Sequence, residues 1–107
     1  MSDPRYKPRS FCAEPEAFGI ANKVDWKSPA LGTETQLAAA MLQHEFAVGI
    51  RRAAKRRYGS IGAYAVHVGQ TPDRLGKVLR GEAIMRLEDL AAAQLHLELN
   101  SSEGRDR

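Results

Sequence analysis

Apolar residues recur with a helical period through most of the chain after Gly32, and the clearest stretch covers residues 60–81. In its first half they have the i, i+3, i+4, i+7 spacing of one helical face: Ile61, Tyr64, Ala65 and Val68. Gly69 follows directly, and glycine commonly ends helices because it adopts the left-handed backbone conformation without strain. The pattern predicts a short helix that ends in a tight turn.

A second short helix is predicted directly after this turn. Its opening residues are typical of a helix N-terminus, namely a capping hydroxyl, a proline and an acid in the positive first turn: Thr71, Pro72 and Asp73. Leu75, Val78 and Leu79 share one face of this helix. Arg74 and Lys77 are left on another face. Two helices joined by a glycine turn, with a polar face on the second, make a helix-turn-helix arrangement.

A longer helix is predicted before this pair. Residues 33–36, Thr-Glu-Thr-Gln, fit the capping box that opens a helix, and the alanine- and leucine-rich run after them extends to about Tyr58. Gly49 within this run indicates a kink or a close packing contact, because glycine lowers helix stability. Gly59 is expected to end the helix, and Ser60 can cap the next one.

A last helix is predicted from Arg86 to about Leu97. Its inward face is expected to carry four apolar residues: Leu87, Leu90, Ala91 and Leu97. Residues 94–99 also alternate polar and apolar side chains, which is the period of a strand. The favoured interpretation is that this segment finishes the helix and that Leu99 closes the core. The other interpretation is a short edge strand that pairs across a dimer axis.

The two ends of the chain lack such periodicity. Residues 1–32 hold four of the five prolines, which favours an irregular arm that is partly ordered or disordered. Phe18 or Trp26 can dock against the body or a second subunit, while the basic start either stays flexible, which is favoured, or follows a DNA groove. Residues 100–107 are expected to form a flexible tail. Residues 33–99 are predicted to be an all-α domain, a small bundle of four to five helices that contains the helix-turn-helix.

Composition argues against several classes of function. Cys12 is the only cysteine, so no internal disulfide can form and a cytoplasmic location is expected. No apolar run has the length of a membrane-spanning helix, so we expect no membrane partner. The histidines match no metal-ligand spacing, and neither a glycine-rich phosphate loop nor a paired nucleophile and base is recognisable. We therefore expect no enzymatic activity, no metal and no cofactor.

Positive charge is concentrated around the helix-turn-helix. The whole chain has a formal net charge of +3, whereas residues 49–81 contain eight basic residues and one acid, a net charge of +7. This density is typical of a surface that binds polyanions. Five of these cations lie within seven residues before the pair: Arg51, Arg52, Lys55, Arg56 and Arg57. Such a run is usually a solvated face, but unrelieved repulsion within this one favours contact with DNA phosphates.

Scattered positions between about Gly49 and Leu99 follow a recognisable pattern. They are Gly49-Ile50-Arg51, Ala65, Gly69, Thr71, Arg80-Gly81 and Leu87-Glu88-Asp89-Leu90. With these residues the segment resembles the XRE-like helix-turn-helix regulators, which include the Cro and lambda-type phage repressors. Tyr64, Met85 and Gly76 depart from the family pattern. The resemblance implies that the second helix of the pair enters the major groove of double-stranded DNA.

The resemblance also implies which residues read base edges. They are the residues at the N-terminal end of the second helix: Gln70, Thr71, Asp73, Arg74 and Lys77. Arg74 or Lys77 can donate to guanine, and Gln70 can read adenine. Thr71 can bind a phosphate at the helix N-terminus. Asp73 either caps its own helix, which is favoured, or accepts from cytosine.

The DNA backbone is assigned to the five-cation run and to Arg80, for which an intramolecular salt bridge is equally open. The predicted function is a sequence-specific double-stranded DNA-binding transcriptional regulator that acts as a repressor. The alternative is a protein-interaction or RNA-binding helix-turn-helix module, for example an antitoxin-like protein that binds a partner.

A homodimer is expected because one recognition helix covers only a few base pairs. The spare apolar residues place its interface mainly in residues 1–32 and the N-terminal half of the first helix, with residues 95–99 as the lesser candidate. The arm can also bind a protein partner. Deletion of residues 1–32 is then expected to leave a monomer that folds and binds DNA weakly.

Overall fold

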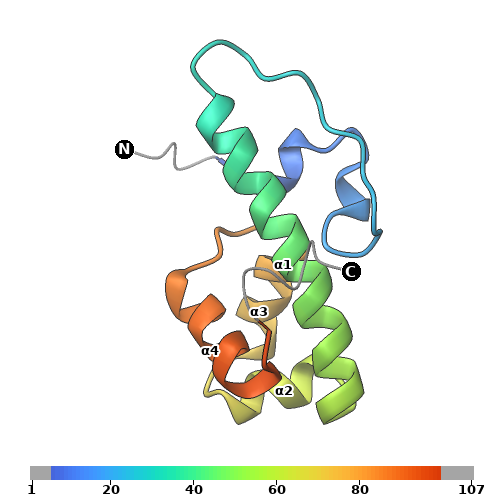
Figure 1. Ribbon diagram of the computed structural model, residues 1–107, viewed down its shortest axis with the longest axis vertical. Coiled ribbons are helices and arrows are strands. Elements are labelled where there is room, and N and C mark those ends of the chain that lie inside the picture. The colour runs from blue at the N-terminus through green and yellow to red at the C-terminus, as the bar shows by residue number, and fades with distance from the viewer. Residues whose placement is uncertain (1–5, 100–107) are drawn as a thin grey trace.

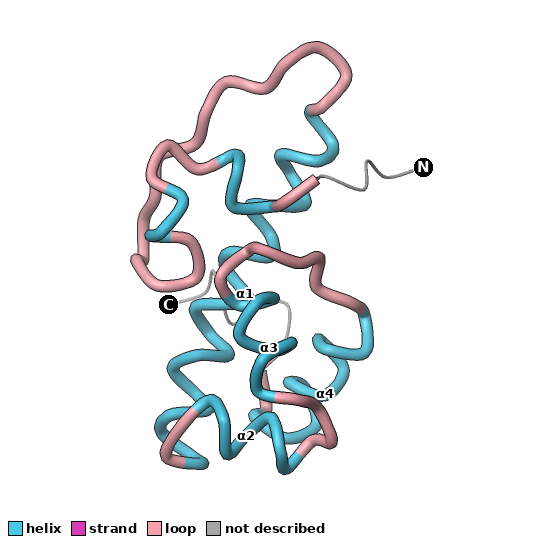
Figure 2. The backbone as a smooth tube through the Cα atoms, turned by 180° about the vertical axis from the view of Figure 1, so that it is seen from behind, coloured by secondary structure: helices cyan, strands magenta, loops and turns pink. Residues whose placement is uncertain are grey.

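One long helix organises the fold. In the computed structural model, which describes residues 6–99, helix α1 (Glu34–Tyr58) runs the length of the molecule, and the three α-helices that follow it pack along it (Figures 1 and 2). Three shorter helices cover its C-terminal half, and an irregular arm lies beside the rest (Figure 1). The predicted all-α bundle is confirmed. The shorter elements, with η for a 3-10 helix, are η1 (Pro8–Phe11), η2 (Pro15–Ala17), α2 (Ile61–His67), α3 (Pro72–Leu79) and α4 (Leu87–Leu97).

The predicted helix boundaries are confirmed where local signals set them. Gly59 ends α1 with a φ of +86°. Ser60 then starts α2, because its Oγ accepts a hydrogen bond from the Ala63 N–H at 3.0 Å. Thr71 starts α3 in the same way, with its Oγ1 accepting from the Arg74 N–H at 3.2 Å. These hydroxyls satisfy N–H groups that a helix start leaves without an intrahelical partner.

The predicted capping box at the start of α1 is wrong. Thr33 does precede the helix, but its hydroxyl donates to the Ala30 carbonyl oxygen at 2.7 Å and caps nothing. The turn before α1 takes this hydroxyl, since the Thr33 N–H bonds to the same carbonyl at 3.0 Å. Helix α1 therefore begins without a side-chain cap, and its stability comes from the packing of its later turns.

The hydrophobic core lies between the C-terminal half of α1 and the α2–α3 pair. Five predicted inward residues of the short helices are at most 2% exposed: Tyr64, Ala65, Leu75, Val78 and Leu79. Ile61 and Val68 are half-buried against the same cluster. Helix α1 supplies mainly small residues to this contact: Ala47, Ile50, Ala53 and Ala54. The predicted faces of α2 and α3 are confirmed.

The predicted inward face of α4 is partly wrong. Leu97 is buried and Leu90 is half-buried, but Leu87 is 81% exposed and Ala91 is exposed as well. Asp89 is buried on the inward face instead, where it forms an ion pair described below. That polar contact selects a face of the helix that hydrophobic periodicity does not mark. The outward face consequently carries an apolar stripe: Leu87, Ala91 and Leu95.

The segment after α4 closes the core, as the favoured interpretation predicted. Glu98 ends the helix with a φ of +58°, and Leu99 turns back over α1. Leu99 packs on Gly49, where a Cβ atom would lie 3.2 Å from both leucine δ carbons. Gly49 therefore serves a close packing contact. Residues 6–99 contain no strand.

A buried glutamine of α1 fixes the loop between α3 and α4. Gln43 Nε2 donates to the carbonyl oxygens of Val78 at 2.9 Å and Ala83 at 2.8 Å. Its Oε1 accepts from the Met85 N–H at 3.0 Å. Because all of its polar atoms are bonded, this side chain stabilises the loop conformation without the cost of an unpaired buried amide.

The arm, residues 6–32, packs into the same core as the helices. Phe18 and Cys12 are 1% and 0% exposed and belong to the cluster that contains the inward residues of α2 and α3. Trp26 is half-buried at a ring-centroid distance of 6.3 Å from Phe18, and it pairs with Cys12 in an isolated β-bridge. The composition change at Gly32 thus divides the chain into two segments that share one core.

Polar contacts place the arm against α1 and the end of α3. The Gly19 N–H donates to Nδ1 of the buried His44 at 2.8 Å, and Arg51 Nε donates to the Gly19 carbonyl oxygen at 3.0 Å. Gly19 has a φ of +75°, and a Cβ atom there would overlap the Leu79 carbonyl oxygen. Only glycine fits this position, for both reasons.

Candidate nucleic-acid interface

Helices α2 and α3 form the helix-turn-helix, and α3 presents one exposed stripe. Across the turn, the Gln70 N–H donates to the Ala65 carbonyl oxygen at 2.8 Å, and Gly69 has a φ of +80°. The apolar side of α3 faces the core, so its opposite side faces solvent. We call this side the α3 stripe, and its members have helical i, i+3, i+4, i+7 spacing: Asp73, Gly76, Lys77 and Arg80.

Two of the five predicted base-reading residues are turned toward α4. Arg74 donates from Nη1 and Nη2 to the two carboxylate oxygens of Asp89, each at 2.9 Å. Gln70 Nε2 donates to Asp89 Oδ1 at 2.8 Å, and its Oε1 accepts from Arg74 Nη1 at 2.6 Å. These contacts tie the N-terminal end of α3 to α4. A base contact by Arg74 would break them and leave the buried Asp89 carboxylate without its ion pair.

The Gln70–Arg74–Asp89 network is reflected in the acidity of its members. The Asp89 side chain is 2% exposed and that of Arg74 is 28% exposed. Burial by itself raises the pKa of Asp89, but hydrogen bonds from Arg74, the Arg86 N–H and Gln70 outweigh it and hold the pKa below its ordinary value. The hydrogen bond to Asp89 raises the pKa of Arg74. The pair is therefore charged at neutral pH.

The other predicted base-reading residues stay at the surface. Thr71 is exposed, and its hydroxyl oxygen caps α3 as described above. Asp73 and Lys77 pair at 3.4 Å across one helical turn, with side chains 79% and 51% exposed. An exposed i, i+4 pair of this kind contributes only a few tenths of a kcal/mol. Lys77 can therefore exchange this partner for another anion at little cost.

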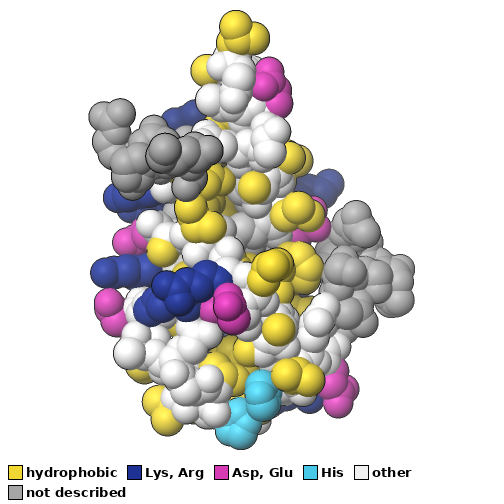
Figure 3. Space-filling model, turned by 90° about the vertical axis from the view of Figure 1, so that its left-hand side faces the viewer, with side chains coloured by type: hydrophobic (Ala, Val, Ile, Leu, Met, Phe, Trp, Pro, Cys, Tyr) yellow, Lys and Arg dark blue, Asp and Glu magenta, His cyan; other side chains and the backbone are white. Residues whose placement is uncertain are grey.

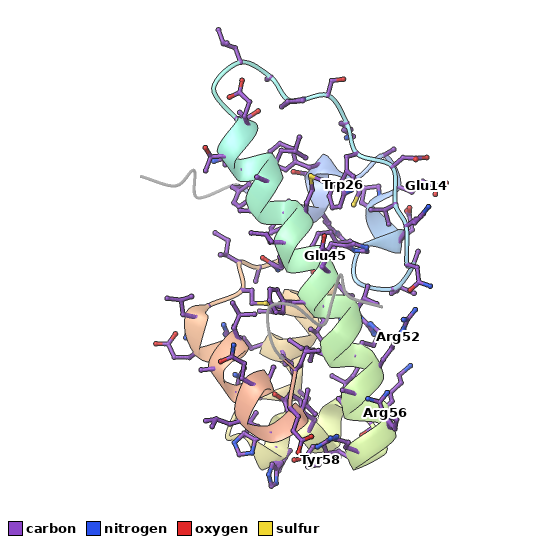
Figure 4. The ribbon with its side chains drawn as sticks, in the orientation of Figure 1. Glu14, Trp26, Glu45, Arg52, Arg56 and Tyr58 are labelled. Carbon is purple, nitrogen blue, oxygen red and sulfur yellow. The ribbon has the colours of Figure 1, made fainter. Side chains whose placement is uncertain are left out.

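The five cations of α1 divide into two groups. Three contact the chain itself: Arg51 through the Gly19 carbonyl, Arg52 through Asn22 Oδ1, and Arg57 through Glu98 Oε1 at 3.0 Å. Lys55 and Arg56 are exposed and form no salt bridge within the described part of the chain. Figure 4 shows Arg52 and Arg56 projecting from the same side of α1.

Arg80 ends the α3 stripe and forms the intramolecular salt bridge that was one of its two open interpretations. Its Nε donates to Glu82 Oε2 at 2.7 Å. The guanidinium folds back over Gly76, where a Cβ atom would lie 2.9 Å from Arg80 Nη1. The glycine that departs from the family pattern thus makes room for this arginine along the surface of α3.

Asp89 and Glu82 are the charged residues that sequence reasoning missed. Asp89 stands at the third position of α4, and its Oδ2 accepts from the Arg86 N–H at 2.8 Å. An acid at this position is a known capping signal, which could have shown that its side chain is occupied. Glu82 follows the glycine that ends α3, and no local pattern indicates that it would bind Arg80.

Apolar side chains gather on the face that carries α4 and the N-terminal half of α1 (Figure 3). A hollow on the surface is lined by residues of the arm, α1, α4 and the loop between α3 and α4, among them Leu42, Phe46, Ile84 and Leu90. Leu42 and Ile84 are 54% and 47% exposed. These exposed apolar side chains are therefore the first place to look for a contact with another protein.

No helix within residues 6–99 has the length and apolar character needed to cross a membrane. In the same part of the chain, no three His, Cys, Asp or Glu side chains gather as the ligands of a metal ion would. Comparisons with protein-family models, with curated proteins and with solved structures give no match. The likeness to XRE-like regulators stays a prediction from the residues that carry it.

Proposed function

We propose that this protein is a sequence-specific double-stranded DNA-binding regulator, acting as a repressor, that inserts α3 into the major groove. The observation that carries the proposal is the α3 stripe, which exposes Lys77 and Arg80 on the second helix of a helix-turn-helix and no large apolar side chain. A helix with this surface suits a groove lined by phosphates and polar base edges. Lys55 and Arg56 of α1 add exposed positive charge that can bind phosphates.

The contacts of each residue refine its proposed role. Lys77 is the main base-reading residue, because it is exposed and its pairing with Asp73 is weak. Gln70 and Arg74 act as positioning residues, since their bonds to Asp89 set the N-terminal end of α3 on α4. Gly76 leaves room for the Arg80 guanidinium along the surface of α3, which keeps this cation on the side of the helix that would face DNA.

Pairing of two chains is part of the same proposal. The arm aromatics that were assigned to a dimer interface are used within the chain, with Phe18 buried and Trp26 half-buried. The apolar side chains that stay exposed include Leu87 and Leu95 of α4, which are 81% and 78% exposed. We therefore place the dimer contact on the apolar stripe of α4 and the neighbouring hollow. Two-fold pairing would set two α3 helices about 34 Å apart on one face of the duplex.

Selection of bound fragments from random duplex DNA, followed by sequencing, tests the function directly. We expect enrichment of a palindrome. Lys77→Ala should weaken binding to it by about 1–3 kcal/mol and relax the preference at one base pair. Lys55→Ala should weaken binding to all sequences alike and lower the salt slope by about 1. Lys23→Ala, which alters an exposed lysine in the arm, is the control.

Failure to enrich any sequence would contradict the proposal. A protein-binding helix-turn-helix module is the second candidate, and the apolar hollow is the observation that favours it. Light scattering shows whether this face pairs two copies of the chain or is left for a different protein. If it pairs two copies, Leu87→Glu should convert the dimer into a monomer of 11.8 kDa. An intact chain that is already monomeric and selects no DNA would favour the second candidate.

A further inference from the structure

A group of charged side chains lies where the arm meets the C-terminal end of α3. One carboxylate oxygen, Glu82 Oε2, accepts from Arg80 Nε at 2.7 Å and lies 3.6 Å from Arg9 Nη1 of the arm. The hydrogen bond from Arg80 is the main cause that lowers the pKa of Glu82, and the charges of Arg80, Arg9 and Lys7 lower it further. Two arginines thus share a single acid.

The backbone holds this group in place. At the end of α3, the Gly81 N–H donates to the Val78 carbonyl at 3.1 Å and the Glu82 N–H to the Lys77 carbonyl at 2.9 Å. These are the two bonds of a Schellman motif, which fixes the residues that follow a helix. The arm joins the motif through the Arg9 N–H, which donates to the Gly81 carbonyl oxygen at 3.0 Å. Arg9 and Arg80 therefore converge because the arm is docked.

The group has more positive charge than its one acid neutralises. The side chains of Arg9, Arg80 and Glu82 are 34%, 46% and 26% exposed, so water and a ligand can reach all three. A phosphate oxygen accepts hydrogen bonds from guanidinium groups in the same geometry as a carboxylate oxygen. Glu82 accordingly occupies the place that a phosphate would take between the two arginines.

The location of the group relates it to DNA. Arg80 is the last residue of the α3 stripe, and the arm places Arg9 beside it. When a helix lies in the major groove, phosphates border the groove at both sides and are bound by cations that flank the helix. We propose that Arg9 and Arg80 form a binding site for a DNA phosphodiester, and that Glu82 holds this site in the free protein and competes with the phosphate. This inference rests on the proposed function.

Competition by Glu82 has a measurable consequence. Each phosphate contact releases bound counterions from DNA and adds to the salt dependence of binding, whatever the base sequence. Removing the Glu82 charge should therefore strengthen binding to any duplex, whereas removing Arg9 should weaken it. An acid elsewhere on the surface should have a smaller effect, because charges beyond about 10 Å are largely screened at moderate salt.

The test measures binding of the full chain to a short duplex of random sequence over a series of salt concentrations. We expect Glu82→Gln to tighten binding about threefold to tenfold at low salt, and Arg9→Ala to weaken it by a similar factor with a salt slope lower by about 1. Glu34→Gln, at the exposed start of α1, removes the same charge and is the control for Glu82. Lys27→Ala, an exposed lysine of the arm, is the control for Arg9.

Equal effects of Glu82→Gln and Glu34→Gln, or of Arg9→Ala and Lys27→Ala, would overturn the inference. Thermal unfolding of each variant shows whether a change in binding follows from loss of structure. Where Arg9→Ala is destabilised, Arg9→Lys and Arg9→Gln decide together. Lysine keeps the charge and glutamine does not, so only Arg9→Gln should weaken binding. If the selection experiment enriches no sequence, the proposed sequence-specific function is refuted. Binding of the variants to the random duplex would still test the phosphate site, because it does not depend on base sequence. Absence of binding by every variant would overturn both.

Discussion

The helix-turn-helix and the arm belong to one core but keep their shape by different means. The α2–α3 pair has signals within its own sequence, including the capping hydroxyls of Ser60 and Thr71 and the left-handed Gly69. The 3-10 helices of the arm have no side-chain caps. The arm is held instead by residues far along the chain, above all by His44 of α1 and by the C-terminal end of α3.

This difference shows how the two regions depend on each other. The arm needs α1 and α3 to give it a conformation, because it has little regular backbone hydrogen bonding of its own. Helix α3, in turn, is fixed at its N-terminal end by Asp89 of α4 and at its C-terminal end by the arm. The helix that we propose enters DNA is therefore held at both of its ends by other parts of the chain.

Removal of the arm should have the largest effect on this arrangement. A chain that starts at Thr33 loses Phe18 and Cys12 from the core, and the loss of a buried phenylalanine alone typically costs about 3–5 kcal/mol. That is a large part of the total stability of about 5–15 kcal/mol expected for a small domain. We expect circular dichroism to show a largely unfolded chain. Cooperative melting of the truncated chain near the temperature of the intact protein would instead support the folded monomer that the sequence pattern predicts.

Gly19→Ala should have the next largest effect, and Gly32→Ala is its matched control. Both glycines have a positive φ, +75° and +85°, but a Cβ atom at position 32 meets nothing within 4 Å, whereas one at position 19 overlaps the Leu79 carbonyl oxygen. Gly32→Ala should therefore cost only the left-handed conformation, about 1–2 kcal/mol. Gly19→Ala should cost clearly more in urea unfolding, because the arm must also move away from α3. Equal costs would mean that the arm does not press on α3.

The sequence predicted the fold best where the chain specifies itself locally. The caps and glycines around α2 and α3 gave correct boundaries, and the apolar spacing gave their inward faces. Periodicity failed for α4, since Asp89 is buried by an ion pair rather than by its hydrophobicity. It was silent on the arm, whose order comes from contacts such as that between Gly19 and His44, which are 25 residues apart.

The candidate site was predictable in outline but not in detail. The density of basic residues around the helix-turn-helix was visible in the sequence, and Lys77 is exposed as a base-reading residue must be. Nothing in the sequence ranked Arg74 below Lys77, because both occupy the polar side of the helix. The choice between them depends on Asp89, which lies 15 residues after Arg74 and comes within its reach because α3 and α4 both pack on α1.

Asp89→Asn should test the contact that holds the N-terminal end of α3 on α4, and its effect can be compared with that of the arm at the other end. The substitution removes the charge that Arg74 and Gln70 both bind, and breaking a buried ion pair typically costs about 3–5 kcal/mol. Because the Arg74 side chain is 28% exposed, we expect a loss near the lower end of this range, about 3 kcal/mol. Glu88→Gln, at the exposed neighbouring position, is the control in urea unfolding. A loss below that of Glu88→Gln would show that Asp89 does not anchor the helix.

The smallest predicted effect is a loss of stability in mild acid, where protonation of His44 breaks its contact with the arm. Nδ1 of His44 accepts from the Gly19 N–H, and the ring packs against Phe18 and Trp26 at centroid distances of 5.3 and 5.7 Å. The structure thus requires the neutral imidazole, and burial lowers the pKa of His44 although Asn22, Ala21 and Glu45 favour the charged form. A protonated ring could not accept the Gly19 bond and would place a charge among aromatic side chains.

The sign of the pH dependence follows from the lowered pKa. As the pH falls, the unfolded chain takes up a proton at His44 near pH 6.5, before the folded chain does. The contribution of His44 to the free energy of unfolding is therefore fully present above this pH and is lost as the pH drops toward the folded-state pKa. A loss of up to about 1.4 kcal/mol per pH unit is expected in this window. The measurement is urea unfolding between pH 7.5 and 5.5, roughly one unit to either side of the unfolded-state pKa. His44→Gln should remove the dependence of the unfolding free energy on pH, because glutamine can accept from Gly19 but does not titrate. Asp89→Asn should keep the slope, since the lowered pKa of Asp89 lies below the window. An intact chain whose stability is constant over this range would show that the arm can leave His44 without cost to the core.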